Sequence, residues 1–112
     1  MLIAGGETTV TVKGSGKGGR NQEMILASLN NLQKKSIVFA SYGTDGIDGM
    51  STAAGAIADS NSLKRAINKN LNMDVFLDDN NSNTFFHKIN DLLITGPTGT
   101  NVMDVQILIK SL

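Results

Sequence analysis

Hydrophobic and polar positions along this chain repeat with two different periods, and they therefore predict both helices and strands. From residue 21 onward, apolar side chains recur at the spacing of one helical face, which predicts a helix beginning at Asn21. The apolar side chains are Ile25, Leu29 and Leu32, with Met24 beside them. This helix is expected to bury that face against a sheet.

Two further stretches predict shorter helices. An apolar face over residues 63–71 predicts a second helix, with Ser60 as its N-cap. Asp74 is expected to cap a short turn over 75–77, and apolar positions within 85–89 predict a last short helix.

Strands are predicted where β-branched and apolar residues cluster between polar turns. They cover residues 2–6, 7–12, 36–42, 53–58, 92–94 and 105–109. The stretch 36–42 is almost continuously apolar, as in a buried central strand. The stretch 53–58 fits a strand or a helix, and a strand is favoured. This order predicts an α/β fold: one domain over residues 1–112, with helices layered on a mixed sheet.

Composition narrows the function classes. The 112 residues fit one domain, and equal numbers of basic and acidic residues, 10 each, argue against a broad nucleic-acid or membrane surface. The sequence has no Cys, which excludes disulfides and thiolate chemistry and suits the cytoplasm. No apolar run reaches the roughly 20 residues of a membrane span. Met1 runs directly into a predicted strand, which indicates a chain cut at a domain boundary or an unusually compact gene product.

Candidate chemistry lies in three glycine-rich polar loops, residues 14–20, 43–49 and 95–101. Each follows a predicted strand, and ligands of open α/β sheets gather where strands end. We therefore expect the three loops to form one composite site at one edge of the sheet.

The first loop precedes a predicted helix start, where backbone N–H groups and the positive helix end favour an anion. Its glycines allow close approach to a ligand and positive φ, and Lys17 and Arg20 add charge. The alternative is a flexible hairpin with solvated basic residues. A P-loop is excluded because Gly18 follows Lys17 where Ser or Thr is required. The pattern Gly-x-Gly-x-x-Gly over 14–19 matches a dinucleotide fingerprint, but such a match alone is weak.

The other two loops leave alternatives open. Asp45 and Asp48 could bind Mg²⁺, accept a proton or hold Arg20, or they could simply make turns. The loop 95–101 offers hydroxyl and amide groups to substrate oxygens, or forms a rigid turn satisfied by its own side chains. His87, the one histidine, is read as a surface or half-buried helix residue.

Several blocks in order resemble the C-terminal domain of the glycerate 2-kinase family, the MOFRL domain, whose parent enzymes were often labelled hydroxypyruvate reductases. The blocks are GGETTVTV at 5–12, GKGGRNQE at 16–23, GTDG at 43–46, AAGA at 53–56 and TGPTGTNV at 95–102. The resemblance covers essentially the whole chain.

The resemblance implies transfer of the γ-phosphoryl of ATP to glycerate, with Mg²⁺, in a cleft shared with a larger Rossmann-like, nucleotide-binding N-terminal domain. That domain is missing from this chain and would be supplied in cis or as a separate chain. Neither nucleic acid nor a membrane is an expected partner, and an exposed domain interface could drive a homodimer. No metal ligand is assigned to this chain, which is expected to bind no cofactor tightly by itself.

Carried over residue by residue, the resemblance implies catalytic roles for Lys17, Arg20 and Asp45. It implies substrate or phosphate binding by Glu7, Gly16, Gly18, Gly19, Thr44, Thr98, Gly99, Thr100 and Asn101. The chain departs from the family pattern at three places: an acidic residue is replaced at Thr52, the Asn-Asp-Ser-Tyr block reads Asn-Asn-Ser-Asn over 80–83, and Met103 replaces Asn. The alternatives are a stand-alone module binding a small carboxylate or phosphate, and an inactive remnant.

Overall fold

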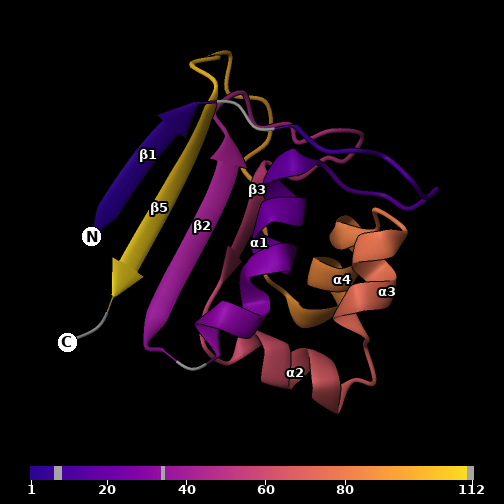
Figure 1. Cartoon of the computed structure of the whole chain (residues 1–112). Helices are drawn as coiled ribbons and strands as arrows, with labels where there is room; N and C mark the ends of the chain where they lie inside the picture. Colours follow the sequence, from indigo (N-terminus) through magenta and orange to yellow (C-terminus); the bar gives the residue numbers. More distant parts are fainter. Residues whose placement is uncertain (7–8, 34, 111–112) are drawn as a thin grey trace.

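The computed structural model describes residues 1–6, 9–33 and 35–110, which form one five-stranded sheet with a layer of helices (Figure 1). The strand order is β1-β5-β2-β3-β4, and neighbouring strands are antiparallel in every pair. The strands are β1 (Leu2–Gly6), β2 (Ile37–Gly43), β3 (Gly55–Ala58), β4 (Leu92–Leu93) and β5 (Asp104–Lys110).

The predicted α/β class is confirmed, whereas the prediction of a mixed sheet was wrong. β1 and β2 run in the same direction, as the intervening helix predicts. They are not neighbours, however, because β5 lies between them and runs antiparallel to both. The last strand of the chain thus separates the pair that would have been parallel.

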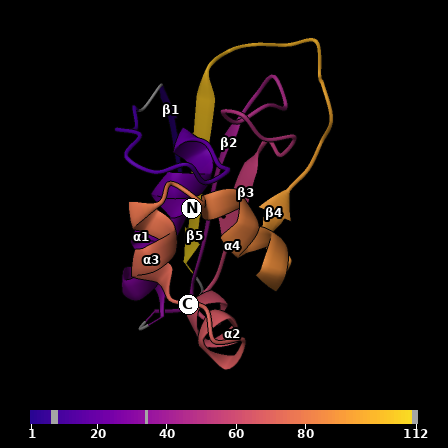
Figure 2. The ribbon, with the colours of Figure 1, turned by 90° about the vertical axis from the view of Figure 1, so that its right-hand side faces the viewer.

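Four helices lie on one face of the sheet: α1 (Arg20–Leu32), α2 (Ser62–Asn68), α3 (Met73–Asp78) and α4 (Ser82–Ile89). Figure 2 looks onto this layer, with the strands behind the helices. In the described residues no helix covers the opposite face (Figure 1). Nor is any helix in this part of the chain long and apolar enough to cross a membrane.

The core fills the space between α1, α4 and the middle of the sheet. The predicted apolar face of α1 is confirmed, since Ile25, Leu29 and Leu32 are all buried. Phe85 and Phe86 of α4 are fully buried and pack edge to face, with ring centroids 5.3 Å apart. Small residues on β3, chiefly alanine, leave room for these large side chains to approach the sheet.

Three local predictions were wrong. Residues 9–12 form no strand, because the chain leaves the sheet at Gly6, whose φ of 139° suits glycine alone. The N-cap position of α2 is Asn61 rather than Ser60. The cap of α3 is Asn72, whose side chain accepts hydrogen bonds from the first turn, rather than Asp74.

Candidate functional site

The three glycine-rich loops meet at one end of the sheet, as predicted. The N–H of Thr98 donates to the carbonyl of Asp45 at 3.3 Å, which joins the third loop to the second. The N–H of Met50, the residue that follows the second loop, donates to the carbonyl of Gly18 at 3.3 Å, which joins the second loop to the first. In Figure 2 the third loop arches above this end of the strands on its way to β5. We call the meeting place of the three loops the loop junction.

The first loop is held by protein groups along most of its length. Five consecutive backbone N–H groups, those of residues 13–17, donate to the segment 79–81 between α3 and α4. Residues 13 and 14 donate to Asn80 Oδ1 at 2.6 and 2.9 Å, residue 15 to Asp79 Oδ1 at 3.1 Å, residue 16 to the Asp79 carbonyl at 2.8 Å, and residue 17 to Asn81 Oδ1 at 3.0 Å. The prediction that this loop offers its N–H groups to a small anion is therefore wrong for residues 14–17.

The glycines of this loop are required by space rather than by backbone angles. A β-carbon on Gly14 would lie 2.4 Å from backbone atoms of Asp79, and one on Gly16 would lie 2.3 Å from the β-carbon of Asn81. Neither glycine has a positive φ. The loop approaches the α3–α4 connection so closely that any side chain at these positions would displace it.

The start of α1 binds a carboxylate of the chain itself, that of Asp48. Asp48 is fully buried, and its carboxylate accepts hydrogen bonds from the backbone and side-chain nitrogens of both Asn21 and Gln22. The four distances lie between 2.8 and 3.1 Å. A carboxylate is stabilised there by the first N–H groups and by the helix dipole. Both oxygens of Asp48 are engaged by α1, so its carboxylate caps the helix rather than making a turn in its own loop.

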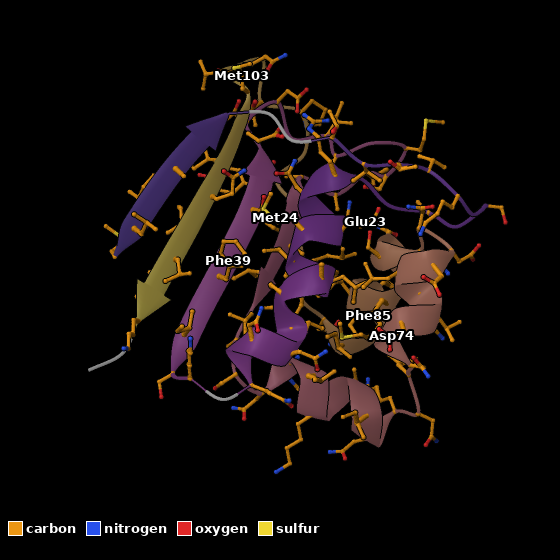
Figure 3. All side chains as sticks on the ribbon, in the orientation of Figure 1. Glu23, Met24, Phe39, Asp74, Phe85 and Met103 are labelled. Atoms are coloured by element: carbon orange, nitrogen blue, oxygen red, sulfur yellow. The ribbon has the colours of Figure 1, made fainter. Side chains whose placement is uncertain are left out.

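The side chains that open α1 extend this arrangement to neighbouring elements. Asn21 accepts a hydrogen bond from Ser41 of β2 at 2.6 Å, and Gln22 accepts one from Asn83 of α4 at 2.9 Å. Glu23, which faces α3 and α4 in Figure 3, accepts from Asn80 at 2.9 and 3.1 Å. The first turn of α1 thus fixes the sheet, the first loop and α4 relative to one another.

Arg20 is held at the loop junction by a residue that the sequence interpretation did not single out. Its Nε and Nη2 donate to the two carboxylate oxygens of Asp104 at 2.6 and 2.7 Å. Asp104 begins β5 and is fully buried, whereas the Arg20 side chain is 29% exposed. Of the alternatives left open for Asp45 and Asp48, a bond to Arg20 is not found among the described contacts, where the partner is Asp104. The available signal was a single acidic residue at the start of a mostly apolar strand.

The remaining predicted site residues differ in their contacts. Lys17 is exposed, and its carbonyl accepts from Asn83 N–H at 2.8 Å. Asp45 accepts from the N–H of Ile47 at 3.1 Å, so its carboxylate shapes its own turn. Glu7 lies outside the described residues. His87 is exposed on α4, as predicted.

Side chains of the second and third loops are largely satisfied within the loops. Thr44 Oγ1 donates to the carbonyl of Met103 at 2.8 Å and accepts from the N–H of Val102 at 2.8 Å. Thr98 Oγ1 donates to the carbonyl of Thr44 at 2.5 Å, and Asn101 accepts from the N–H of Met103 at 3.2 Å. The reading of the third loop as a turn that its own side chains stabilise is therefore favoured for these groups.

A hollow of about 220 Å³ lies beside the first loop. Glycines 16, 18 and 19 line it with Arg20, Glu23 and Asn80, and valine and methionine side chains complete it: Val10, Val12 and Met50. The hollow combines an apolar wall with the Arg20 guanidinium. It is the concave surface that accompanies the loop junction.

Another polar cluster ties α2 to the start of β4. Arg65 donates to both carboxylate oxygens of Asp91 at 3.1 Å, and Ser62 donates to the same carboxylate at 2.6 Å. Burial raises the pKa of Asp91, and the bonds from Ser62 and Arg65 partly oppose that rise. These contacts stabilise the packing of α2.

Met103 adopts a left-handed backbone conformation, with φ of 71°, above the sheet (Figure 3). Such a conformation costs an ordinary side chain roughly 1–2 kcal/mol, and Asn tolerates it best after Gly. We expect Met103→Asn to stabilise the chain by about 0.5–1 kcal/mol, seen as a Tm several degrees higher in thermal unfolding. Met103→Ala is the control, because alanine keeps the strain. An equal gain from both variants would contradict the explanation.

Comparison with known proteins identifies the family. The MOFRL family model matches residues 1–104, so the chain belongs to the MOFRL family. It is 47% identical to a glycerate kinase of Danio rerio, with 96% of this chain and 23% of that protein covered. It is 46% identical to D-glycerate 2-kinase of Thermotoga maritima, with 95% and 26% covered. The chain spans about a quarter of the length of these curated relatives, matching their C-terminal part.

Solved structures agree with the fold. The crystal structure of glycerate kinase from Thermotoga maritima superposes with a TM-score of 0.95 at 44% identity, covering 98% of this chain and 27% of that one. The crystal structure of the PH0495 protein from Pyrococcus horikoshii superposes with a TM-score of 0.94 at 40% identity, covering 98% and 26%. The resemblance stated from the sequence is confirmed.

Proposed function

We propose that residues 1–112 act as the C-terminal domain of a glycerate 2-kinase and form one wall of an interdomain active site. The observation that carries the proposal is the fixed position of Arg20 at the loop junction, paired with buried Asp104 at 2.6 and 2.7 Å. The family and the names of the relatives supply the reaction class: phosphorylation of glycerate by ATP.

In the proposed reaction, a hydroxyl oxygen of glycerate forms a bond to the γ-phosphorus of ATP, the bond to ADP breaks, and the hydroxyl proton leaves to a base. Catalysis of phosphoryl transfer depends mainly on positioning and on stabilising charge. Arg20 would stabilise charge on the phosphoryl or carboxylate oxygens from a fixed position, since Asp104 holds two of its nitrogens. Lys17 would add a mobile positive charge from the first loop.

Asp45 and the third loop would complete this wall. Because the Asp45 carboxylate accepts from the N–H of Ile47, it has an oxygen held in place on the second loop. Thr98, Gly99, Thr100 and Asn101 are exposed in the third loop and would contact the substrate there. Thr44 would act mainly through the third loop, which its hydroxyl fastens at Val102.

ATP and Mg²⁺ would belong mainly to the rest of the enzyme. In the described residues no group of three or more His, Asp or Glu side chains is placed to hold a metal ion. Mg²⁺ is commonly bound by one or two carboxylates together with substrate phosphates and water, so Asp45 could supply one oxygen to it. When bound, Mg²⁺ would neutralise charge on the phosphates. The nucleotide itself would be held by the N-terminal domain, in cis or as a separate chain, in the cytoplasm.

The alternative of a stand-alone module for small anions has lost its strongest support. Its predicted donors were the backbone N–H groups of the first loop, and those of residues 13–17 are occupied by the segment 79–81. Its helix-start site contains Asp48. The Arg20 side chain and the adjacent hollow are what a partner domain would share.

A hybrid enzyme tests the proposal directly. The chain would replace the matching C-terminal quarter of Thermotoga maritima D-glycerate 2-kinase, and ADP release would be followed with D-glycerate, ATP and Mg²⁺. We expect turnover by the hybrid and none by either part alone, because the site needs both walls. A folded hybrid without turnover would contradict the proposed function.

A further inference from the structure

The face of the sheet that points away from the helices is apolar across its whole width. The pairing register places Ile3 of β1, Ile107 of β5, Ala40 of β2 and Ile57 of β3 in one row across four strands. Phe39 and Ser41, the neighbours of Ala40, point to the helices instead, as their contacts show. We call the surface formed by this row and the two neighbouring rows the open face.

The neighbouring rows have the same character. One pairs Ile109 with Val38, and the other runs from Gly5 through Val105, Tyr42 and Gly55 to Leu93. The strand positions on this face include no charged residue. Several of their side chains are exposed: Ile3 by 58%, Ile109 by 46%, Ile57 by 41% and Val38 by 37%. A contiguous apolar surface of this kind marks an interface rather than a solvated face.

The sequence itself predicts burial of this surface. Strand β2 was expected to be buried on both sides because its apolar run is almost continuous. The structure covers only the side that packs against α1 (Figure 1). Strands with two apolar faces are typical of sheets with helices on both sides, whereas the described helices of this chain all lie on one side (Figure 1).

The relatives contain additional polypeptide that could form a second helical layer. The chain spans about a quarter of their length, while its fold is conserved in the solved glycerate kinase with a TM-score of 0.95. Most of each relative's polypeptide is therefore available to cover the open face. The row across the strands has small Ala40 between Ile107 and Ile57.

We propose that the open face is a second interdomain interface, distinct from the loop junction, covered by amphipathic helices of the remaining glycerate kinase polypeptide. It rests on the proposed function only in that the partner is the rest of such an enzyme. The partner segment presents an apolar stripe, because the open face has no charged residue with which a polar stripe could pair. Docking there would hold the two domains together at the sheet while the loop junction stays accessible to substrate.

Cysteine labelling tests this interface, since the chain has no cysteine of its own. Ile57→Cys and Val38→Cys place thiols on the open face, and Ile67→Cys places one on the exposed side of α2 as a matched control. Maleimide labelling of this chain alone is compared with labelling of the hybrid enzyme, and mass spectrometry assigns each label to its peptide. Ser41→Cys, at a buried position, stays unlabelled wherever the fold is intact.

In the hybrid we expect Ile57→Cys and Val38→Cys to label roughly tenfold more slowly or less, because a buried thiol reacts only when the interface opens. Ile67→Cys should react equally in both proteins. Equal labelling of the open face in a hybrid that protects Ser41→Cys would overturn the interface, even if the hybrid turns over glycerate. Slow labelling in a hybrid without turnover would support the interface while contradicting the proposed function. Protection of this chain alone that grows with its concentration would assign the face to a second copy and overturn the proposal.

Discussion

Asp48→Ala is expected to lower the free energy of unfolding by about 3–5 kcal/mol, which is a large share of the stability of a domain of this size. The cause is the loss of one carboxylate that satisfies two backbone and two side-chain donors at the start of α1. Asn21 and Gln22 are themselves fully buried, so water would not readily replace it. Urea unfolding followed by circular dichroism measures the change.

Asp45→Ala is the matched control, because Asp45 lies in the same loop and its carboxylate accepts from only the N–H of Ile47 among the described hydrogen bonds. Its loss should stay below about 1 kcal/mol, as expected for a partly exposed turn. Asp48→Asn keeps the size of the side chain but turns an NH₂ group toward a donor, so an intermediate loss is expected. If Asp48→Ala cost no more than Asp45→Ala, the helix start would not depend on this carboxylate.

A part of this fold was predictable from the sequence where residues close in the chain determine it, and not where distant residues do. The buried face of α1 was predictable because Ile25 and Leu29 express a repeat that every turn of a helix shares. The position of β5 was not, because insertion between β1 and β2 depends on pairing across the whole chain. The second predicted strand, over residues 7–12, was wrong at residues 9–12 because Gly6, with its positive φ, ends β1 and overrides the β propensity of the residues after it.

The candidate site also has features that the sequence predicted and features that it did not. The meeting of three loops at one end of the sheet was predictable, since glycine and polar residues followed successive strands. Glycine also signals that something approaches the backbone closely, but not what approaches. At Gly14 and Gly16 it is the α3–α4 connection, and at the start of α1 the anion is Asp48. Tertiary contacts within the chain therefore occupy the backbone N–H donors that the local pattern assigned to a ligand.

The MOFRL resemblance predicted what local patterns could not, because several sequence blocks in the same order identify a whole fold rather than a single element. It assigned a catalytic role to Arg20, which the local loop pattern had given only as a source of charge, and the structure adds Asp104 as the group that holds Arg20. Met103, by contrast, departs from the family pattern at a backbone conformation that favours Asn. The departure at Met103 thus has a structural cost, independent of any role in chemistry.

In the hybrid enzyme, Arg20→Lys is expected to lower kcat about 100-fold, because lysine keeps the charge but cannot keep the two-point contact with Asp104. Steady-state ADP release measures kcat and KM separately. Arg20→Ala is a poorer test, since it would leave the fully buried Asp104 carboxylate without this partner and destabilise the fold. Arg65→Lys is the matched control, because Arg65 also contacts both oxygens of one carboxylate but lies on α2. It should change stability and leave kcat unaltered.

Asp104→Asn distinguishes a positioning role from a merely structural one. We expect it to lower kcat about tenfold with a small change in KM, because the guanidinium loses its fixed position while the charge remains. Combined with Arg20→Lys, it should add little further loss, since both changes interrupt the same contact. Full kcat in Arg20→Lys would remove Arg20 from the mechanism. Losses that multiply in the double variant would show that Asp104 acts independently of Arg20, and the positioning of this guanidinium would then need another cause.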